Sequence, residues 1–253
     1  MNAREPLSVV VTTLNNAATL ERCLASVTFA DERLLVDSGS SDDTLAIAAA
    51  HGCRILHKPF TGYGPQKQWA IEQATHRYAL LLDADEWLPD DCQAEIVALM
   101  ASAPSLAGWR IPRRELIFWQ YQHRWARLNT FLRIVDRARF RMSASAVHAA
   151  PEVDGPTATL RCAFHHDGEP DIATKVAKVN AYSSGLVADK LAAGARLPLL
   201  RAIVYPPWFF LRQYLFKRQF LDGSAGFVQS VVGAFYVFLK YAKLHEVRRR
   251  HRR

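Results

Sequence analysis

The sequence predicts an α/β fold: a mostly parallel sheet flanked by helices, followed by a helical segment that associates with a membrane. Short apolar runs alternate with helical patterns over residues 7–102, and this alternation is typical of parallel strands joined by crossover helices. After Pro170 the pattern is helical, and positive charge gathers towards the C-terminus. Half of the 253 residues are hydrophobic and 22% are charged, which is a globular composition.

Four pairs of a strand and a helix make up the N-terminal part of the prediction. The strands are apolar runs, rich in β-branched residues, at residues 7–13, 33–37, 54–57 and 78–82. The helices follow at residues 15–25, 41–50, 65–74 and 89–100. Ser40 or Ser41 can cap the second helix, and Pro89 suits the start of the fourth. In sheets of this kind, ligands bind beyond the carboxyl ends of the strands.

The pattern changes in the second half of the chain. Further strands are expected at residues 109–112, 132–135 and 159–164. A helix follows Pro170, because apolar residues from Ile172 to Leu186 recur on one face at helical spacing. We therefore predict two domains, one over residues 1–165 and a helical, basic, aromatic-rich one over residues 166–253.

The sharpest chemical feature is the acidic run Asp83-Ala84-Asp85-Glu86, which directly follows the fourth strand. Three carboxylates at the mouth of a buried strand repel one another, so a positive group must offset them. Hard oxygen ligands in this position suit Mg²⁺ or Mn²⁺ together with substrate phosphates. The simpler alternative is a solvated loop or a cap for the helix after Pro89.

A second polar group follows the first two strands. The turn from Asp37 to Thr44 joins an acid at a strand end, a glycine and a helix N-terminus. Thr12, Thr13 and Asn15 end the first strand at the same edge of the sheet. Asp37 can accept a hydrogen bond from a nucleobase or a ribose hydroxyl, although a well-capped turn explains the same residues. No dinucleotide or P-loop motif is present.

These motifs resemble family 2 of the glycosyltransferases, which have the GT-A fold. The resemblance rests on the first strand, on the 37–44 turn and on the 83–86 run. Within the family, the enzymes of lipopolysaccharide core assembly are most similar. They share the segment 62–68 (GYGPQKQ) and three C-terminal segments, namely 206–208 (PPW), 220–223 (FLDG) and 235–243 (FYVFLKYAK).

The resemblance implies an inverting, metal-dependent transferase that moves a hexose from a nucleotide sugar, with glucose from UDP-glucose as the expected donor. The expected acceptor is a lipid-linked saccharide such as the lipopolysaccharide inner core. The implied donor-binding residues are Thr12, Thr13, Asn15, Asp37, Ser38, Lys67, Asp83 and Asp85. Asp85 and Asp83 would hold the Mg²⁺ or Mn²⁺ ion. Two alternatives remain, a polyprenyl-phosphate glycosyltransferase and a non-catalytic nucleotide-sugar-binding scaffold on the membrane.

The chain departs from the family pattern where a general base is expected. Similar proteins have Val-His-Glu where this chain has Val147-His148-Ala149, and alanine cannot accept a proton. The base is then His148 or Glu152, or the chain is catalytically weak.

The run 118–125 has aromatic and basic residues where relatives have glycines. It is either an acceptor loop, with Arg124 or Arg127 at acceptor phosphates, or ordinary packing. His165 and His166 offer another metal ligand, but neighbouring side chains in a strand point apart.

The C-terminal charge indicates a membrane partner. Residues 201–253 contain eleven Lys or Arg and only two acidic residues, interleaved with aromatic residues. This favours anionic lipid headgroups over packing on the catalytic domain, and no nucleic-acid motif accompanies it. The apolar run 226–239 is shorter than the roughly 20 residues of a membrane span. With no signal peptide and four scattered cysteines, expected to be reduced, we predict a cytoplasmic protein on the inner face of the cytoplasmic membrane.

Overall fold

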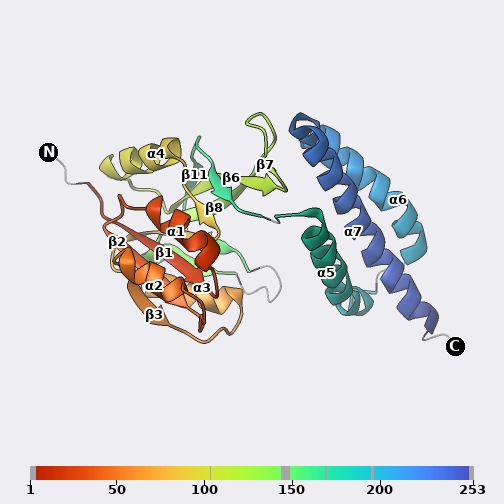
Figure 1. The fold of residues 1–253 in the computed structure, drawn as a ribbon, viewed down its shortest axis with the longest axis horizontal. Helices are drawn as coiled ribbons and strands as arrows, with labels where there is room; N and C mark the ends of the chain where they lie inside the picture. Colours follow the sequence, from red (N-terminus) through yellow and green to blue (C-terminus); the bar gives the residue numbers. More distant parts are fainter. Residues whose placement is uncertain (1–3, 103, 144–148, 169, 195–196, 251–253) are drawn as a thin grey trace. The chain divides into compact units, whose positions relative to one another are not determined.

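The computed structural model describes residues 4–102, 104–143, 149–168, 170–194 and 197–250. The chain forms two compact units. The first comprises Met1–Arg114 and Asn129–Asp167, and the second comprises Glu115–Leu128 and Gly168–Arg253. The first unit contains the sheet and the second contains the long C-terminal helices (Figure 1). Residues 115–128 therefore group with the C-terminal helices, which the division at residue 165 did not foresee.

The sheet has the strand order β3-β2-β1-β4-β8-β6-β12-β5, and β11 pairs with β6. Strands β3, β2, β1 and β4 run parallel, and β8 and β6 extend the sheet in antiparallel pairing. The α/β class and the parallel N-terminal strands predicted from the sequence are thereby confirmed. The strands are β1 (Leu7–Thr13), β2 (Glu32–Asp37), β3 (Arg54–His57), β4 (Tyr78–Asp83), β5 (Glu86–Trp87), β6 (Gly108–Ile117), β8 (Asn129–Asp136), β11 (Thr157–Thr159) and β12 (Phe164–His166).

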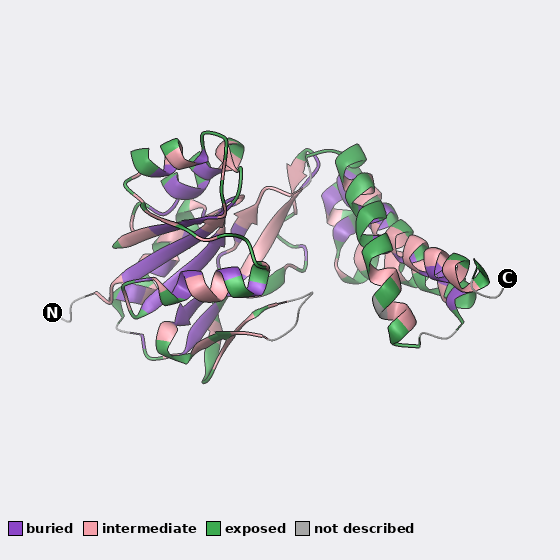
Figure 2. Ribbon diagram, turned by 90° about the horizontal axis from the view of Figure 1, so that it is seen from below, coloured by how far each residue is buried: buried purple, intermediate pink, exposed green. Residues whose placement is uncertain are grey.

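Hydrophobic cores cover both faces of the sheet, as the purple strands of Figure 2 show. Successive side chains point to opposite faces, so Val9 joins one core and Val10 joins the other. Helices α1 (Ala17–Ala25), α2 (Thr44–Ala50) and α4 (Asp90–Ala101) contribute to the first core, and α3 (Tyr63–Glu72) contributes to the second. This packing fixes β1 beside β4, with Thr12 opposite Asp83 at their carboxyl ends.

Two helices begin two or three residues later than the sequence predicted, for a local reason in each case. Asn15 has a positive φ of 54°, which is outside the helical region, so α1 begins at Ala17. The Asp42 carboxylate accepts hydrogen bonds from the backbone N–H and the hydroxyl of Thr44. This side-chain turn occupies the residues before α2, which therefore begins at Thr44.

The strand predicted at residues 159–164 is wrong, because β11 ends at Thr159 and β12 begins at Phe164. Between them, the backbone N–H groups of Arg161 and Cys162 donate to the carboxylate of Glu95 instead of to a neighbouring strand. Cys162 also forms a disulfide with Cys92, their Cα atoms being 4.9 Å apart. The expectation of reduced thiols is therefore wrong for this pair.

The second unit is built from α5 (Ile172–Ala192), α6 (Pro198–Leu211) and α7 (Gly223–Arg250). One π-helical turn, η2 (Arg212–Phe216), and a 3₁₀ turn, η3 (Gln219–Asp222), join α6 to α7. The hairpin formed by the end of β6 and by β7 (Gln120–Tyr121) is held by Asp222. The Asp222 side chain accepts from the backbone N–H of His123, and its main-chain carbonyl accepts from the Gln120 side chain.

One helical stretch, Gln219–Arg250, is long and apolar enough to cross a membrane. The apolar run 226–239 is shorter than a span, but the helical stretch that contains it has 32 residues, so the expectation that it is too short to span is wrong. Length and composition alone are weak evidence of a span, because core helices of soluble proteins also meet both conditions. A third of its most apolar window is buried within the protein.

Candidate active site

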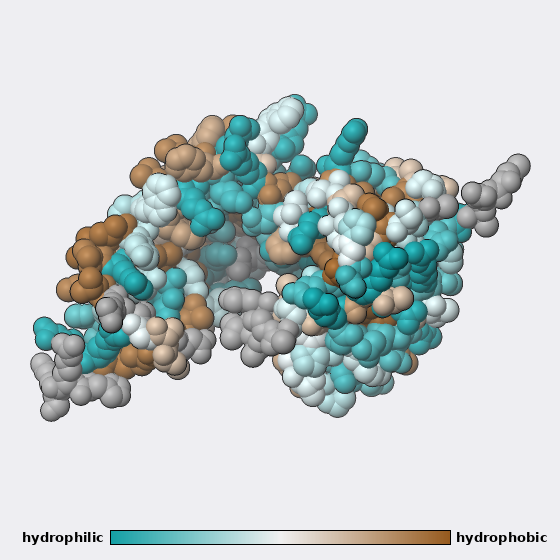
Figure 3. Space-filling model, turned by 180° about the vertical axis from the view of Figure 1, so that it is seen from behind, coloured by the Kyte–Doolittle hydropathy of each residue, from teal (hydrophilic) through white to brown (hydrophobic). Residues whose placement is uncertain are grey.

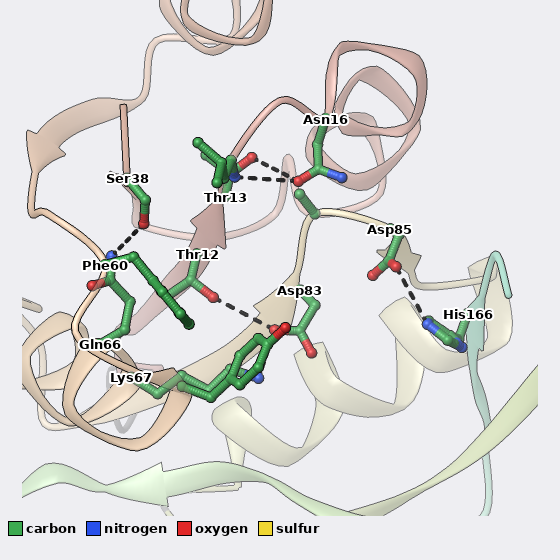
Figure 4. A pocket seen from close by; sticks show the side chains of 13 residues that line it. Thr12, Thr13, Asn16, Ser38, Phe60, Gln66, Lys67, Asp83, Asp85 and His166 are labelled. Atoms are coloured by element: carbon green, nitrogen blue, oxygen red, sulfur yellow. Dashed lines mark hydrogen bonds and ion pairs between the residues drawn. The ribbon is translucent and has the colours of Figure 1, made fainter. Parts of the chain in front are cut away.

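A cavity of about 420 Å³ lies beyond the carboxyl ends of β1, β2 and β4, where the fold class predicts a ligand site (Figure 4). The first turn of α3 and the end of β12 complete its wall. Its polar lining consists of Thr12, Thr13, Asn16, Ser38, Gln66, Lys67, Asp83, Asp85 and His166. Phe60 and Tyr63 stand at its rim with exposed rings 5.1 Å apart.

Asp83 is the best-compensated carboxylate of the cavity. Its Oδ1 lies 2.6 Å from Nζ of Lys67, and the hydroxyl of Thr12 donates to it at 3.5 Å. Burial acts to raise the pKa of Asp83, but the charges of Lys67 and Arg133 outweigh burial and lower the pKa to about 2. Asp83 is therefore ionised at neutral pH. The positive groups that the acidic run requires come from Lys67 and Arg133.

Asp85 faces a histidine that lies 81 residues later in the chain. Strand β12 pairs with β5, and this places Nε2 of His166 3.3 Å from Oδ2 of Asp85 (Figure 4). His165 points elsewhere, with its ring 4.4 Å from that of Trp87, and burial lowers its pKa to about 4. The two histidines do point apart as a strand requires, and that orientation brings His166 into the cavity.

Glu86 does not line the cavity but supports it from behind. It is buried, pairs with Arg133 and accepts a hydrogen bond from the backbone N–H of Asp83 at 3.0 Å. Burial raises the pKa of Glu86 to about 7, and the charge of Arg133 opposes that rise. The third acid of the run therefore anchors the backbone that presents Asp83 and Asp85.

Asp37 and Asn15 are absent from the residues that line the cavity in the described part of the chain. Asp37 is fully buried, and its carboxylate accepts from the N–H groups of Gly39 and Ser40 and from the Ser40 hydroxyl. Burial would raise the pKa of Asp37, but these hydrogen bonds outweigh it and lower the pKa. The Asn15 side chain accepts from the backbone N–H of Ser41. In this structure both residues shape the turns around the cavity, and neither faces it.

Of the two candidate general bases, the structure describes Glu152 alone. His148 lies outside the described residues. Glu152, on β10 (Pro151–Val153), pairs with Arg141 at 3.0 Å and is absent from the described lining of the cavity. Ala149 lies beside the start of α3, since a Cβ added to Gly64 would come within 2.8 Å of its methyl group. Position 149 therefore lies next to the helix turn that carries Lys67.

The structure brings together six of the eight predicted donor residues, namely Thr12, Thr13, Ser38, Lys67, Asp83 and Asp85. Sequence reasoning missed Asn16, Gln66 and the aromatic rim, and it undervalued His166. Among the described residues, no group of three or more His, Cys, Asp or Glu side chains is arranged to hold a metal ion. A cation at Asp85 and His166 would therefore need ligands from a substrate.

Comparison with known proteins identifies the family of this chain. Residues 8–154 match the profile described as Glycosyl transferase family 2. The lipopolysaccharide core biosynthesis glycosyltransferase LpsC of Rhizobium meliloti (strain 1021) is 31% identical, over 95% of this chain and 92% of that protein. An uncharacterized glycosyltransferase of Rickettsia felis is 32% identical, over 96% of this chain and 90% of that protein.

Solved structures give a weaker likeness. The crystal structure of glucosyl-3-phosphoglycerate synthase from Mycobacterium tuberculosis with Mn²⁺, UDP and glucosyl-3-phosphoglycerate is 23% identical and covers 44% of each chain, with a TM-score of 0.36. A likeness this low carries no inference about the present chain.

Proposed function

Because this chain belongs to glycosyl transferase family 2, we propose that it transfers glucose from UDP-glucose to a lipid-linked saccharide such as the lipopolysaccharide inner core. The single observation that supports a nucleotide-sugar site best is the cavity at the strand ends. It joins one lysine, two carboxylates and the hydroxyl groups of two threonines and one serine, and these groups suit a diphosphate, a cation and a ribose.

Asp85 and His166 fit a divalent cation, either Mg²⁺ or Mn²⁺. Their ligand atoms are 3.3 Å apart, and two adjacent ligands of an ion at about 2.1 Å lie roughly 3 Å apart. Asp83 supplies a second carboxylate to the same cavity. When bound, such an ion neutralises charge on the departing diphosphate.

The chain's own residues then have separate roles in an inverting transfer. The acceptor oxygen forms its bond to the anomeric carbon of the sugar as the bond to the diphosphate oxygen breaks. Lys67, which pairs with Asp83 in this structure, can turn to a phosphate oxygen and offset its charge. Thr12, Thr13 and Ser38 supply hydroxyl groups for the nucleoside.

We propose His148 as the base that takes the acceptor proton. Its neighbour Ala149 lies against Gly64, next to the cavity, and the usual pKa of histidine is near neutrality. Glu152 is the weaker candidate, because Arg141 already pairs with it.

A lipid-linked acceptor is anchored in a membrane, so an enzyme that uses it must act at the membrane surface. We therefore place it peripherally on the cytoplasmic side of the inner membrane, held by the basic and aromatic C-terminal helices.

One observation favours a second candidate, a polyprenyl-phosphate glycosyltransferase. Ala149 removes the expected acid, and a phosphate acceptor is already an anion that needs no base to deprotonate it. The non-catalytic scaffold has less support, because Lys67, Asp83 and Asp85 are all retained in the cavity.

Product analysis tests these proposals. Membranes are incubated with the protein and with UDP-glucose radiolabelled in the sugar, and lipids are then separated. We expect label in lipopolysaccharide or its lipid-linked core. Label extracted as a polyprenyl-phosphate sugar would instead establish the second candidate. If no labelled product forms and the protein still binds UDP, the non-catalytic scaffold would be the remaining candidate.

A further inference from the structure

Helix α6 of the second unit carries a broad apolar face. The inference drawn from this face rests on the proposed function and says how the protein associates with a membrane. Helix α6 packs against α7 through buried residues such as Ala202 and half-buried residues such as Phe209. Away from this contact, apolar side chains are 43–63% exposed, and the charged residue of α6, Arg201, is half-buried over the rings of Tyr205 and Tyr241. We define these exposed apolar side chains as the α6 face, which consists of Leu199, Leu200, Ile203, Val204, Trp208 and Leu211 of α6 and of Leu215 of η2.

We propose that the α6 face lies in the plane of a bilayer that contains anionic lipids, as an interfacial and not a membrane-spanning element. Figure 3 shows hydrophobic side chains gathered along one edge of the C-terminal helical unit. Helix α7 adds an exposed stripe, from Phe227 through Val231 to Phe235 and Phe238. Exposed apolar surface of this extent, bounded by polar residues, is a mark of an interaction site.

Basic residues bound the α6 face at both ends. At one end, α6 is followed by Arg212 and Arg218, which are both exposed. At the other end, Arg248 and Arg249 of α7 line a common hollow with Leu199 and Leu200. Arginine stems can lie along the apolar surface while their charged heads reach lipid phosphates.

This charge distribution selects a lipid surface over a second copy of the chain. Pairing two α6 faces would bring arginine-rich ends together, and like charges across an interface oppose association. Of the two acidic residues in 201–250, Asp222 is buried and Glu246 already pairs with Arg250. Anionic headgroups provide the complementary charge.

Helix α5 argues against a membrane span. It lies along α7, where Nζ of Lys243 is held by Asn180, Ser183 and Ser184 at 2.7–2.8 Å. A spanning α7 would draw α5 into the hydrocarbon, including the exposed side chain of Lys178. Burying charged and polar groups there is costly. An in-plane position leaves α5 in water and buries only the apolar faces.

The test compares two isoleucines of the full chain by sedimentation with vesicles of mixed phosphatidylglycerol and phosphatidylcholine. Ile203 is 63% exposed on the α6 face, and Ile172 is 42% exposed on α5. We expect Ile203→Glu to lower the vesicle partition coefficient about tenfold or more, because it removes an apolar side chain from the proposed lipid contact. The matched control Ile172→Glu should stay within about twofold of wild type.

Three results would overturn the proposal. The first is wild-type sedimentation of Ile203→Glu. The second is a wild-type dimer that binds no vesicles and that Ile203→Glu converts to a monomer, since that would assign the face to a second copy. The third is protection of Arg248–Arg250 from trypsin added outside sealed vesicles, since that would mean that α7 spans. UDP titration of both variants separates this inference from the enzyme proposal, because both should bind UDP as wild type does.

Discussion

Replacing Lys67 with methionine perturbs the proposed donor site at its centre. Its Nζ lies 2.6 Å from the Asp83 carboxylate, and only 16% of its side chain is exposed. We expect Lys67→Met to weaken UDP binding about 10- to 100-fold, because a hydrogen bond to a charged group contributes about 1.5–3 kcal/mol.

The same change should strengthen the binding of Mn²⁺ alone. Asp83 is ionised at neutral pH, and without Lys67 its carboxylate has no close lysine to compete with a metal ion. Asp83 is 34% exposed, so the pair is screened by solvent and is worth at most about 1 kcal/mol. The expected gain in Mn²⁺ affinity is therefore roughly two- to fivefold.

The assay is isothermal titration of Mn²⁺ alone and of UDP in the presence of Mn²⁺. Lys58→Met is the matched control, because Lys58 packs over the ring of Trp69 at 5.0 Å and is absent from the described lining of the cavity. Opposite changes for the two ligands separate a charge effect from general damage, which would weaken both. Unchanged UDP affinity in Lys67→Met would refute the role of Lys67 at the phosphates.

Three further predictions concern other residues of the first unit. Burial would raise the pKa of Glu32, but hydrogen bonds led by that of Ser8 lower it from 4.5 to about 2. A depressed pKa stabilises the folded state above pH 4.5 and loses that effect as the pH falls towards 2. In urea unfolding, Glu32→Gln should therefore lower the free energy of unfolding by about 2–3 kcal/mol at pH 7 and have almost no effect near pH 2. An equal loss of free energy at both pH values would contradict this. His166→Ala should weaken Mn²⁺ binding at least about tenfold by removing the partner of Asp85, and unchanged Mn²⁺ titration would exclude it as a ligand. Ala149→Glu should raise the initial rate of transfer to a hydroxyl acceptor about tenfold or more, and no gain would indicate an acceptor that needs no further base.

Local signals in the sequence were sufficient for the parallel half of the sheet. The runs at β1 and β4 are apolar on both faces because both faces are covered, and such runs are recognisable without a structure. The acidic run follows β4 directly, so its place at the strand end was also predictable. Lys67 was expected at the donor site only from the resemblance to the family, and its pairing with Asp83 was not predicted.

Contacts between distant segments could not be predicted from local sequence patterns. His166 reaches Asp85 only because β12 pairs with β5, and strands this short carry little pattern. Cys92 and Cys162 are separated by 70 residues and belong to no motif. Asp37 has the residue type of a nucleoside ligand, but which way its carboxylate turns depends on the hydrogen bonds of its own turn.

The central claim is that Asp85 belongs to a metal-dependent nucleotide-sugar site. Its most direct test is isothermal titration of UDP and UDP-glucose, with and without Mn²⁺ or Mg²⁺, into wild type and Asp85→Asn. We predict metal-dependent UDP binding in wild type and its loss in Asp85→Asn, with the circular dichroism spectrum unchanged. Undiminished binding in Asp85→Asn, or no UDP binding by wild type with either metal, would contradict the claim.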